Sequence, residues 1–362
     1  MKIFYVANIR IPTEKAHGLQ IMKMCEAFSN LGHEVVLLVP NRKNSLIDNP
    51  FLYYGIEENF KIKKIPILDT VNFGKWGFVF ESILFSIMSS FYLFFKKVDL
   101  IYTRDEYPAL VSLFLFRKVL WESHTGAYNV VAKFVIKASK KIIVISEGLK
   151  RFYVGKGVSE KKIVVAGDAV DMAEFSISES KEECREKLNL PKDKKIVLYT
   201  GHLYDWKGVD TLAQSAKQFD TDVEFVFVGG TEKDIKSFKE KYGSILNIKI
   251  LGQKPHDDIP YYLKSADLLV IPNSAESQVS REFTSPMKLF EYMASKTPFI
   301  ASNIPSIKDI VGENVDIFFE PDNNEDLAKK IHQSLLKEQT HNFSDILKNS
   351  SWESRAENIL NN

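Results

Sequence analysis

This sequence contains little cysteine, and its net charge is close to zero. Only Cys25 and Cys184 occur among the 362 residues, which excludes a disulfide framework and a cysteine-based metal site. The 48 basic and 47 acidic residues leave a formal charge of +1, so no overall field draws the chain to nucleic acid or anionic lipid. Residues 1–8 lack the long apolar core of a secretory signal. We therefore expect a cytoplasmic location and no nucleic-acid partner.

Repeats of short period and low-complexity tracts are also missing, and the length favours two domains. One segment, residues 76–95, carries a single charged side chain, Glu81, over a length that could span a bilayer. Serines such as Ser86, Ser89 and Ser90 interrupt its apolar character. These polar residues favour a buried or interfacial helix over a membrane span. The segment thus predicts at most a peripheral contact, at the inner face of the cytoplasmic membrane.

Short apolar runs alternate with helical patterns along the whole chain, which indicates parallel βαβ units. The candidate strands of the first half are residues 2–7, 34–39, 100–103, 118–121, 141–145 and 162–165. Those of the second half are residues 195–200, 224–228, 248–251, 267–271, 298–301 and 317–319. We predict an α/β fold of two Rossmann-like domains facing across a cleft, residues 1–171 and 172–345. Residues 346–362 form a helix that returns to the first domain.

Ligands of open parallel sheets bind beyond the carboxyl ends of the strands, and in the second half one such end is rich in glycine. The strand 195–200 runs into Gly201, and Lys207-Gly208 follows directly before a helical pattern. Backbone N–H groups at a helix start and a nearby lysine together bind anions. On this stretch alone, a solvated lysine beside a helix-starting glycine is an equally good interpretation.

A second candidate site follows the strand 267–271. Ser285 and Pro286 suit the N-cap and N1 positions of a helix whose amides would face an anion. Lys288 adds a cation that could stabilise a departing nucleoside diphosphate without a metal. Glu291 could accept hydrogen bonds from ribose hydroxyls. The alternative is a helix-surface carboxylate, but the apolar residues around it indicate a buried helix, where an idle charge is costly.

The first half offers weaker candidates in the same strand-end positions. Gly18 opens the first long helix and could let its N-terminus approach a ligand; an ordinary βα loop is the alternative, and the functional interpretation is favoured. His124, Arg104 and Asp105 each follow a predicted strand. His17 and Lys15 lie beside Gly18. A lone histidine is more often structural than functional, so His124 needs further support.

That support comes from several motifs in a fixed order, which together resemble the family-4 retaining glycosyltransferases of the GT-B fold. The matching residues span most of the chain: Gly18, 32–35, 122–124, 144–147, 168–171, 207–208 and 286–294. The resemblance implies that the second domain binds the nucleotide-sugar donor and the first binds the acceptor. It also implies a metal-independent reaction without any cofactor besides the donor, a UDP- or GDP-sugar. The acceptor would be a glycan or a lipid-linked glycan of the cell envelope.

Residue roles also follow from the resemblance. His124, Lys207 and Glu291 would be catalytic, with His124 close to the reacting sugar carbon. The donor would be held by Gly18, Gly201, His202, Lys207, Ser285, Pro286, Met287, Lys288, Leu289 and Glu291. The acceptor candidates rest on placement instead: Arg104 and Asp105 directly follow a strand, and His17 lies beside Gly18.

The sequence departs from the family pattern in three places. Members of the family usually carry two glutamates separated by seven residues, but Phe283 occupies the first position here and Glu282 lies one place earlier. His202 stands where many members have an arginine, and Asp168-Ala169 replaces the usual Asn-Gly or Asp-Gly. Phe283 removes the contact that the first glutamate would make to the donor sugar, His202 is a weaker and pH-dependent cation than arginine, and Asp168-Ala169 must avoid backbone conformations that only glycine accepts readily.

Three other functions share parts of this pattern. A dehydrogenase also uses Rossmann units, but no G-x-G-x-x-G follows the first strand. A sugar-nucleotide epimerase has the same architecture and would isomerise the donor alone. A catalytically degenerate homologue would bind the ligand without turnover. The transferase remains the favoured function, with the oligomeric state left open.

Overall fold

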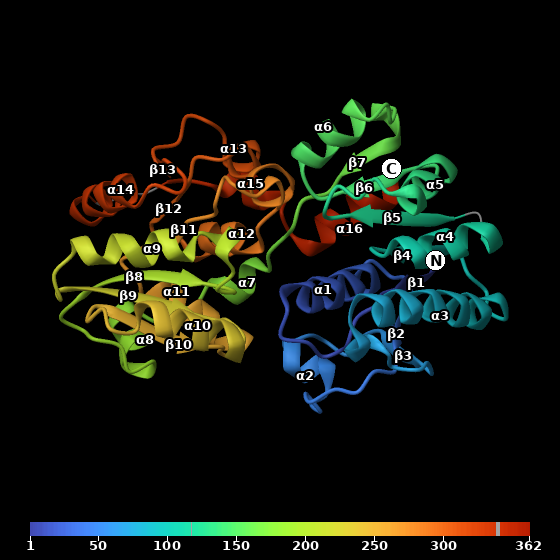
Figure 1. Cartoon of the computed structure of the whole chain (residues 1–362), viewed down its shortest axis with the longest axis horizontal. Helices are drawn as coiled ribbons and strands as arrows, with labels where there is room; N and C mark the ends of the chain where they lie inside the picture. The colour runs from blue at the N-terminus through green and yellow to red at the C-terminus, as the bar shows by residue number, and fades with distance from the viewer. Residues whose placement is uncertain (117, 338–340) are drawn as a thin grey trace. The chain divides into compact units, whose positions relative to one another are not determined.

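The computed structural model describes residues 1–116, 118–337 and 341–362, which form two compact units (Figure 1). The first unit contains Met1–Gly167 and Trp352–Asn362, and the second contains Asp168–Ser351. The predicted boundaries lay at residues 171 and 345, within six residues of these. Both units are parallel α/β domains, as the alternating sequence pattern predicts.

The first unit is built on a parallel sheet of seven strands in the order β3-β2-β1-β4-β5-β6-β7. Its strands are β1 Lys2–Val6, β2 Glu34–Pro40, β3 Lys61–Ile65, β4 Leu100–Thr103, β5 Val119–Ser123, β6 Ile142–Val144 and β7 Ile163–Val165. The sequence predicted all of these except β3. That strand lies at the sheet edge and exposes its lysines, so it lacks the continuous apolar run of a central strand.

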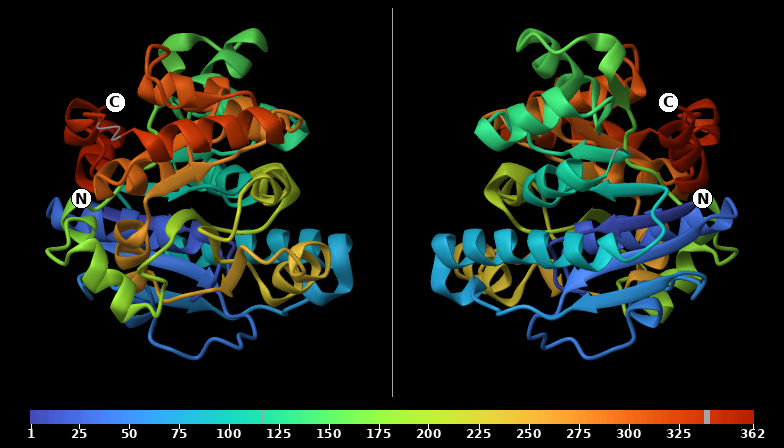
Figure 2. Two further views of the ribbon diagram at one scale, coloured as in Figure 1. Left: turned by 90° about the vertical axis from the view of Figure 1, so that its left-hand side faces the viewer. Right: turned by 90° about the vertical axis from the view of Figure 1, so that its right-hand side faces the viewer.

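Helices connect these strands on both faces of the sheet. They are α1 Ala16–Asn30, α2 Pro50–Tyr54, α3 Gly74–Phe94, α4 Glu106–Leu115, α5 Val130–Ala138, α6 Glu147–Gly155 and α16 Trp352–Asn361, with short η1 Val71–Phe73 and η2 Glu160–Lys162. Figure 2 shows α3, in light blue, as the long helix beside the blue strands. The chain returns to this unit through α16, which packs on α1.

The second unit has a parallel sheet of six strands in the order β10-β9-β8-β11-β12-β13. Its strands are β8 Lys195–Thr200, β9 Val223–Val228, β10 Ile248–Gly252, β11 Leu268–Ile271, β12 Phe299–Ser302 and β13 Phe318–Phe319. All six match the predicted runs to within one residue at each end. Because β8 is central and pairs with β9 and β11, the loops after these three strands lie side by side.

The helices of the second unit are α7 Met172–Phe175, α8 Lys181–Lys187, α9 Val209–Ser215, α10 Glu232–Tyr242, α11 Ile259–Ser265, α12 Met287–Ser295, α13 Pro305–Val311, α14 Asn324–Leu336 and α15 Ser344–Lys348. Short helical turns are η3 Asp205–Lys207, η4 Ala216–Gln218, η5 His256–Asp258 and the π-helical turn η6 Val279–Phe283. Separate apolar clusters cover the two faces of the sheet. One includes most of α12, which fixes the helix that carries Lys288 and Glu291.

One helical stretch among the described residues, Val71–Phe94, is long and apolar enough to cross a membrane by length and composition alone. Within the first unit this helix packs against α4. The sequence predicted a helix over the same segment.

Candidate active site

Two glycine turns bring the loops of the second unit into contact at the carboxyl ends of its strands. Gly208 has a left-handed backbone with φ of +68°, and a Cβ atom there would lie 1.7 Å from the carbonyl oxygen of Pro272. The Lys207-Gly208 turn is therefore pressed against the end of β11, where only glycine fits. Gly201, with φ of +126°, lies next to Lys288, because a Cβ at Gly201 would be 3.1 Å from Nζ of that lysine.

Lys288 is a buried cation at this point. Its Nζ lies 3.7 Å from the ring centroid of Tyr199, and within the described part of the chain no group accepts a hydrogen bond from it. Burial lowers the pKa of Lys288 well below its usual value, and the nearby charge of Lys207 lowers it further, while Glu291 acts in the opposite direction. An ammonium group in this position has no hydrogen-bonded counter-ion among the described residues, so the arrival of an anion would stabilise its charged form.

Lys207 is the second cation of the same site. It is half-buried, and its Nζ lies 3.9 Å from the ring centroid of Trp206. Burial lowers the pKa of Lys207 to about 8, although Asp168 raises it. Since each lysine disfavours the charge of the other, the pair is suited to an anion with more than one negative charge.

Glu291 lies in the second turn of α12, among both acidic and basic neighbours. Burial raises its pKa to about 7; His256 and Lys288 lower it, and Glu174 and Asp168 raise it. His256 in turn lies with Nε2 2.6 Å from a carboxylate oxygen of Glu174. No local pattern predicts this pair, because η5 and α7 are far from α12 in the sequence.

The start of α12 differs from the prediction. The helix begins at Met287, and Pro286 with an extended backbone is its N-cap, without a side-chain capping bond. Ser285 as N-cap and Pro286 as N1 were therefore wrong by one residue. The reason is that the Ser285 hydroxyl accepts a hydrogen bond from the Asp168 amide at 2.8 Å. Leu289 has a fully buried side chain, and its amide donates to the Pro286 carbonyl.

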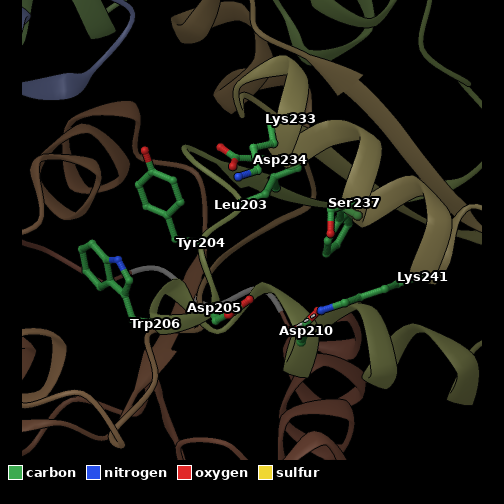
Figure 3. A pocket seen from close by; sticks show the side chains of 10 residues that line it. Leu203, Tyr204, Asp205, Trp206, Asp210, Lys233, Asp234, Ser237 and Lys241 are labelled. Carbon is green, nitrogen blue, oxygen red and sulfur yellow. Dashed lines mark ion pairs between the residues drawn. The ribbon is translucent and has the colours of Figure 1, made fainter. Parts of the chain in front are cut away.

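His202 directly follows Gly201 and lies among aromatic and acidic neighbours. Its ring stacks on Tyr204 with centroids 4.9 Å apart, and its Nδ1 is 4.0 Å from a carboxylate oxygen of Asp234. Tyr204, Trp206 and Asp234 also line a pocket of about 500 Å³ between the Lys207 loop and α10 (Figure 3).

The position usually held by the first glutamate of the family pattern lies in η6. Phe283 is buried at 3% exposure, whereas Glu282 is partly exposed and bound to the Arg281 guanidinium at 2.8 Å. A π-helical turn contains one residue more than an α-helical turn. The side chains before Phe283 are thus rotated relative to those of an unbroken α-helix.

In the first unit, Glu122 is the centre of a buried charge network at the end of β5. Its carboxylate receives Arg355 Nη2 at 2.7 Å and His124 Nε2 at 2.5 Å, together with the Tyr102 hydroxyl. Burial alone would raise the pKa of Glu122, but Arg355 and His124 outweigh it and hold the pKa below its usual value. From the sequence, Glu122 stands out only as part of the 122–124 motif, and no local signal points to Arg355.

His124 is fixed inside this network by both ring nitrogens. Nε2 donates to Glu122, and Nδ1 lies 3.0 Å from Nη2 of Arg104, which is itself bound to Gln20. Because guanidinium can only donate, Nδ1 is the accepting nitrogen. Burial and Arg104 lower the pKa of His124 to about 4, although Glu122 raises it. At neutral pH the imidazole is therefore uncharged.

This lowered pKa predicts a pH-dependent stability. Between pH 4 and pH 6.5 the unfolded chain binds a proton at His124 that the folded chain does not, so this residue makes stability rise with pH. The full effect is up to about 3 kcal/mol. Glu291, whose pKa is raised to about 7, acts in the opposite direction. Urea unfolding at several pH values should show that His124→Gln reduces the pH slope; an unchanged slope would contradict the assignment.

The remaining first-unit candidates have structural partners. The Asp105 carboxylate accepts the Asn8 amide at 2.7 Å, which holds the loop between β1 and α1. Burial raises the pKa of Asp105, although the Asn8 bond and Arg104 lower it. A Cβ at Gly18 would meet the Tyr54 hydroxyl at 2.2 Å, so packing of that ring explains the glycine.

His17, in the first turn of α1, is partly exposed, and Lys15 is exposed. Arg42, which no local sequence signal singles out, holds the loop after β1: its Nη2 binds both the Asn8 side chain at 2.7 Å and the Glu81 carboxylate at 2.5 Å.

No group of three or more His, Cys, Asp or Glu side chains suited to a metal ion occurs among residues 1–116, 118–337 and 341–362. The sequence contains one Asp-x-Asp, Asp220-Thr221-Asp222. It lies directly before β9, at the amino end of the sheet, whereas Gly201, Lys207 and Lys288 lie at the carboxyl ends. This Asp-x-Asp is therefore not part of the candidate site.

Two family models match the chain, one in each half. Residues 18–174 match the model described as Glycosyltransferase Family 4, and residues 180–350 match that described as Glycosyl transferases group 1. The chain is a family-4-type glycosyltransferase. Its motifs at Gly18, Lys207 and Glu291 all lie within the matched residues.

Curated relatives of this glycosyltransferase match part of its length. It is 28% identical over 163 residues to TuaC of Bacillus subtilis, named for teichuronic acid biosynthesis, covering 44% of this chain and 39% of that protein. It is 27% identical over 241 residues to the lipopolysaccharide 1,2-N-acetylglucosaminetransferase of Salmonella typhimurium, covering 60% of each. The chain therefore spans less than two thirds of the length of either relative.

Solved structures match the glycosyltransferase over nearly its whole length. HepE of Anabaena in complex with UDP has a TM-score of 0.70 at 15% identity and covers 99% of this chain and 94% of that chain. A glycosyltransferase from Rickettsia africae has a TM-score of 0.69 at 20% identity, with 100% and 94% covered. Identities this low establish the fold alone, which is GT-B.

Proposed function

We propose that this glycosyltransferase moves a sugar from a nucleoside diphosphate sugar to an acceptor hydroxyl, with retention of the anomeric configuration and without a metal. The observation that carries the proposal is the buried Lys288 ammonium, which has no hydrogen-bond acceptor among the described residues and lies beside Gly201. A diphosphate supplies the charge that this group lacks. The complexes of HepE with UDP and with UDP-glucose support the choice of ligand class.

In this mechanism Lys207 and Lys288 stabilise the negative charge that builds on the diphosphate as the sugar departs. Glu291 accepts hydrogen bonds from the ribose hydroxyls and so fixes the nucleoside. Gly201 leaves room for the phosphate because it has no side chain. The acceptor hydroxyl attacks the oxocarbenium-like sugar from the side of the leaving group, and the departing phosphate receives its proton. His124 is neutral at physiological pH and helps to position Arg104 at the end of β4.

The acceptor class and cellular role are proposals of the same kind. The names of the relatives from Bacillus subtilis and Salmonella typhimurium refer to teichuronic acid and lipopolysaccharide. They support a glycan or lipid-linked acceptor in cell-envelope synthesis. We place the reaction in the cytoplasm, with no cofactor other than the nucleotide-sugar donor.

The test is calorimetry of the purified protein with UDP, GDP, ADP and NAD, repeated with Glu291→Ala. One nucleoside diphosphate should bind, and the variant should bind it at least about tenfold more weakly, because hydrogen bonds to a carboxylate are lost. Lys236→Ala changes an exposed residue of α10; it is the matched control and should bind normally. Binding of NAD alone, or of no nucleotide, would overturn the proposal.

Incubation with the donor, with and without an acceptor, distinguishes the two alternative activities. A transferase releases nucleoside diphosphate slowly when water accepts the sugar and rapidly when an acceptor is present. An epimerase changes the sugar without releasing the nucleotide. A degenerate homologue binds and does neither. Turnover should persist in the presence of a chelator, and its loss would exclude metal independence.

A further inference from the structure

Helix α3 has its polar side against the protein. Glu81, Ser82, Ser86, Ser89 and Ser90 are all buried, with at most 2% of each exposed. The Ser82 hydroxyl accepts a hydrogen bond from the Asn8 side chain at 2.8 Å. A surface helix of a soluble protein usually buries its apolar residues and exposes its polar ones. In α3 the buried side combines these polar residues with Phe85 and Leu93, and most of the other apolar residues are exposed.

Apart from Phe85 and Leu93, which belong to the core, the large apolar residues of α3 are partly or largely exposed. Trp76 is 83% exposed, Phe91 61% and Phe94 65%. Phe80 and Ile87, which lie on α3 between them, are more than half exposed. Single exposed apolar residues are ordinary, but a row of aromatic side chains along a helix of 21 residues indicates a surface that contacts something other than water.

The neighbouring helices extend this surface. Helix α4 packs between α3 and α5, and its Phe114 is 75% exposed. On α5, Val130 and Phe134 are also exposed. We call the outward side of α3, α4 and α5 the apolar face. Its residues all belong to the first unit.

The charges on and around the apolar face are almost all positive. Lys75, Lys96, Lys97, Lys133 and Lys137 are exposed. The carboxylates of these three helices are withdrawn from the surface: Glu81 is buried, and Glu106 is partly buried and hydrogen-bonded to Asn129. A chain with a net charge of only +1 thus concentrates positive charge around its most apolar surface.

We propose that the apolar face docks on the surface of an anionic lipid bilayer, with the aromatic side chains in the headgroup region and the lysines against lipid phosphates. Aromatic residues and lysine favour this region of a membrane. Two copies of the chain fit less well, because symmetric pairing of the same face would bring its lysines together. The positive rim therefore favours lipid as the occupant.

The inner side of α3 excludes a membrane span for this helix. Glu81 is ion-paired with Arg42 at 2.5 Å, and Ser82 binds Asn8 directly after β1. Crossing a bilayer would break these contacts and expose Glu81 and the serines to lipid, which is costly. Helix α3 instead lies along the interface. Docking does not depend on the proposed transfer activity, and it can be tested without a donor or an acceptor.

The experiment is flotation of the full chain with two kinds of vesicle, one of phosphatidylcholine alone and one of equal parts phosphatidylglycerol and phosphatidylcholine. The protein should float with the anionic vesicles and much less with the neutral ones. Phe91→Ser with Phe94→Ser should lower the partition coefficient by about tenfold or more, because two large apolar side chains are lost. Leu246→Ser with Leu336→Ser removes two side chains that are 90% and 86% exposed in the second unit, and should leave it unchanged.

The charge is tested separately. Lys96→Glu with Lys97→Glu should weaken binding to anionic vesicles by about tenfold or more, whereas Lys236→Glu with Lys239→Glu on α10 should not. All variants change exposed residues, so circular dichroism should show a folded protein. Equal binding to both vesicles, or no binding to either, would overturn the proposal. Sedimentation showing a dimer that only the Phe91 and Phe94 variant dissociates would also overturn it and assign the face to a second copy.

Discussion

Replacing Lys288 with methionine should weaken the binding of nucleoside diphosphate while stabilising the empty protein. The ammonium group is buried beside Gly201 without a hydrogen-bond acceptor among the described residues. Its removal should therefore raise the free energy of unfolding by about 1 to 3 kcal/mol. Methionine has a similar length and packs well on an aromatic ring such as Tyr199. The loss of charge-assisted bonds should weaken diphosphate binding by about a hundredfold.

The pH dependence gives the same prediction a second check. The pKa of Lys288 is lowered in the folded protein, so the unfolded chain binds more protons between that lowered value and about 10.4. The stability of the wild type therefore rises with pH through this range, and the advantage of methionine shrinks. Lys236→Met, an exposed control, should change neither stability nor binding. A variant that is less stable than the wild type at neutral pH would contradict the buried-cation interpretation.

Replacing Arg355 with methionine should have the largest effect on stability. It leaves the Glu122 carboxylate, which is fully buried, without its 2.7 Å partner. Breaking a buried ion pair by removing one partner costs about 3 to 5 kcal/mol. Urea unfolding followed by fluorescence measures the change. Glu357→Ala, an exposed change on the same helix, is the control and should be nearly silent.

A double variant separates the charge from the packing. Glu122→Gln with Arg355→Met removes both charges and should recover part of the lost stability, because no uncompensated carboxylate remains. Deleting the residues after Ser350 removes α16 altogether and should destabilise the first unit at least as much as Arg355→Met. If the single Arg355 variant unfolds like the wild type, the network contributes little to stability.

The sequence predicted the architecture because strand patterns are local. Central strands such as β8 and β11 are continuous apolar runs, and these runs could be recognised from their own residues. The edge strand β3 was missed because its alternating lysines and isoleucines give no such run. The positions of Gly201, Lys207 and Glu291 at strand ends followed from the topology of a parallel sheet.

Contacts between distant segments could not be predicted in this way. Arg355 and Glu122 are 233 positions apart, and no local pattern connects α16 to the end of β5. The same holds for Ser285, whose hydroxyl binds the Asp168 amide 117 positions away instead of capping its own helix. The preference of serine for the N-cap position is a local signal. The tertiary hydrogen bond from the Asp168 amide competes with it, and the helix begins one residue later than predicted.

The discontinuous first unit also determines when its charge network can form during translation. Arg355 follows the whole second unit in the chain, so a ribosome must synthesise Asp168–Ser351 before it reaches the partner of Glu122. Until then the Glu122 carboxylate has only His124 and Tyr102 as partners, and the network lacks its guanidinium group. The second unit therefore has all of its residues available first, although its sequence comes later, and the first unit completes its fold around the arriving α16.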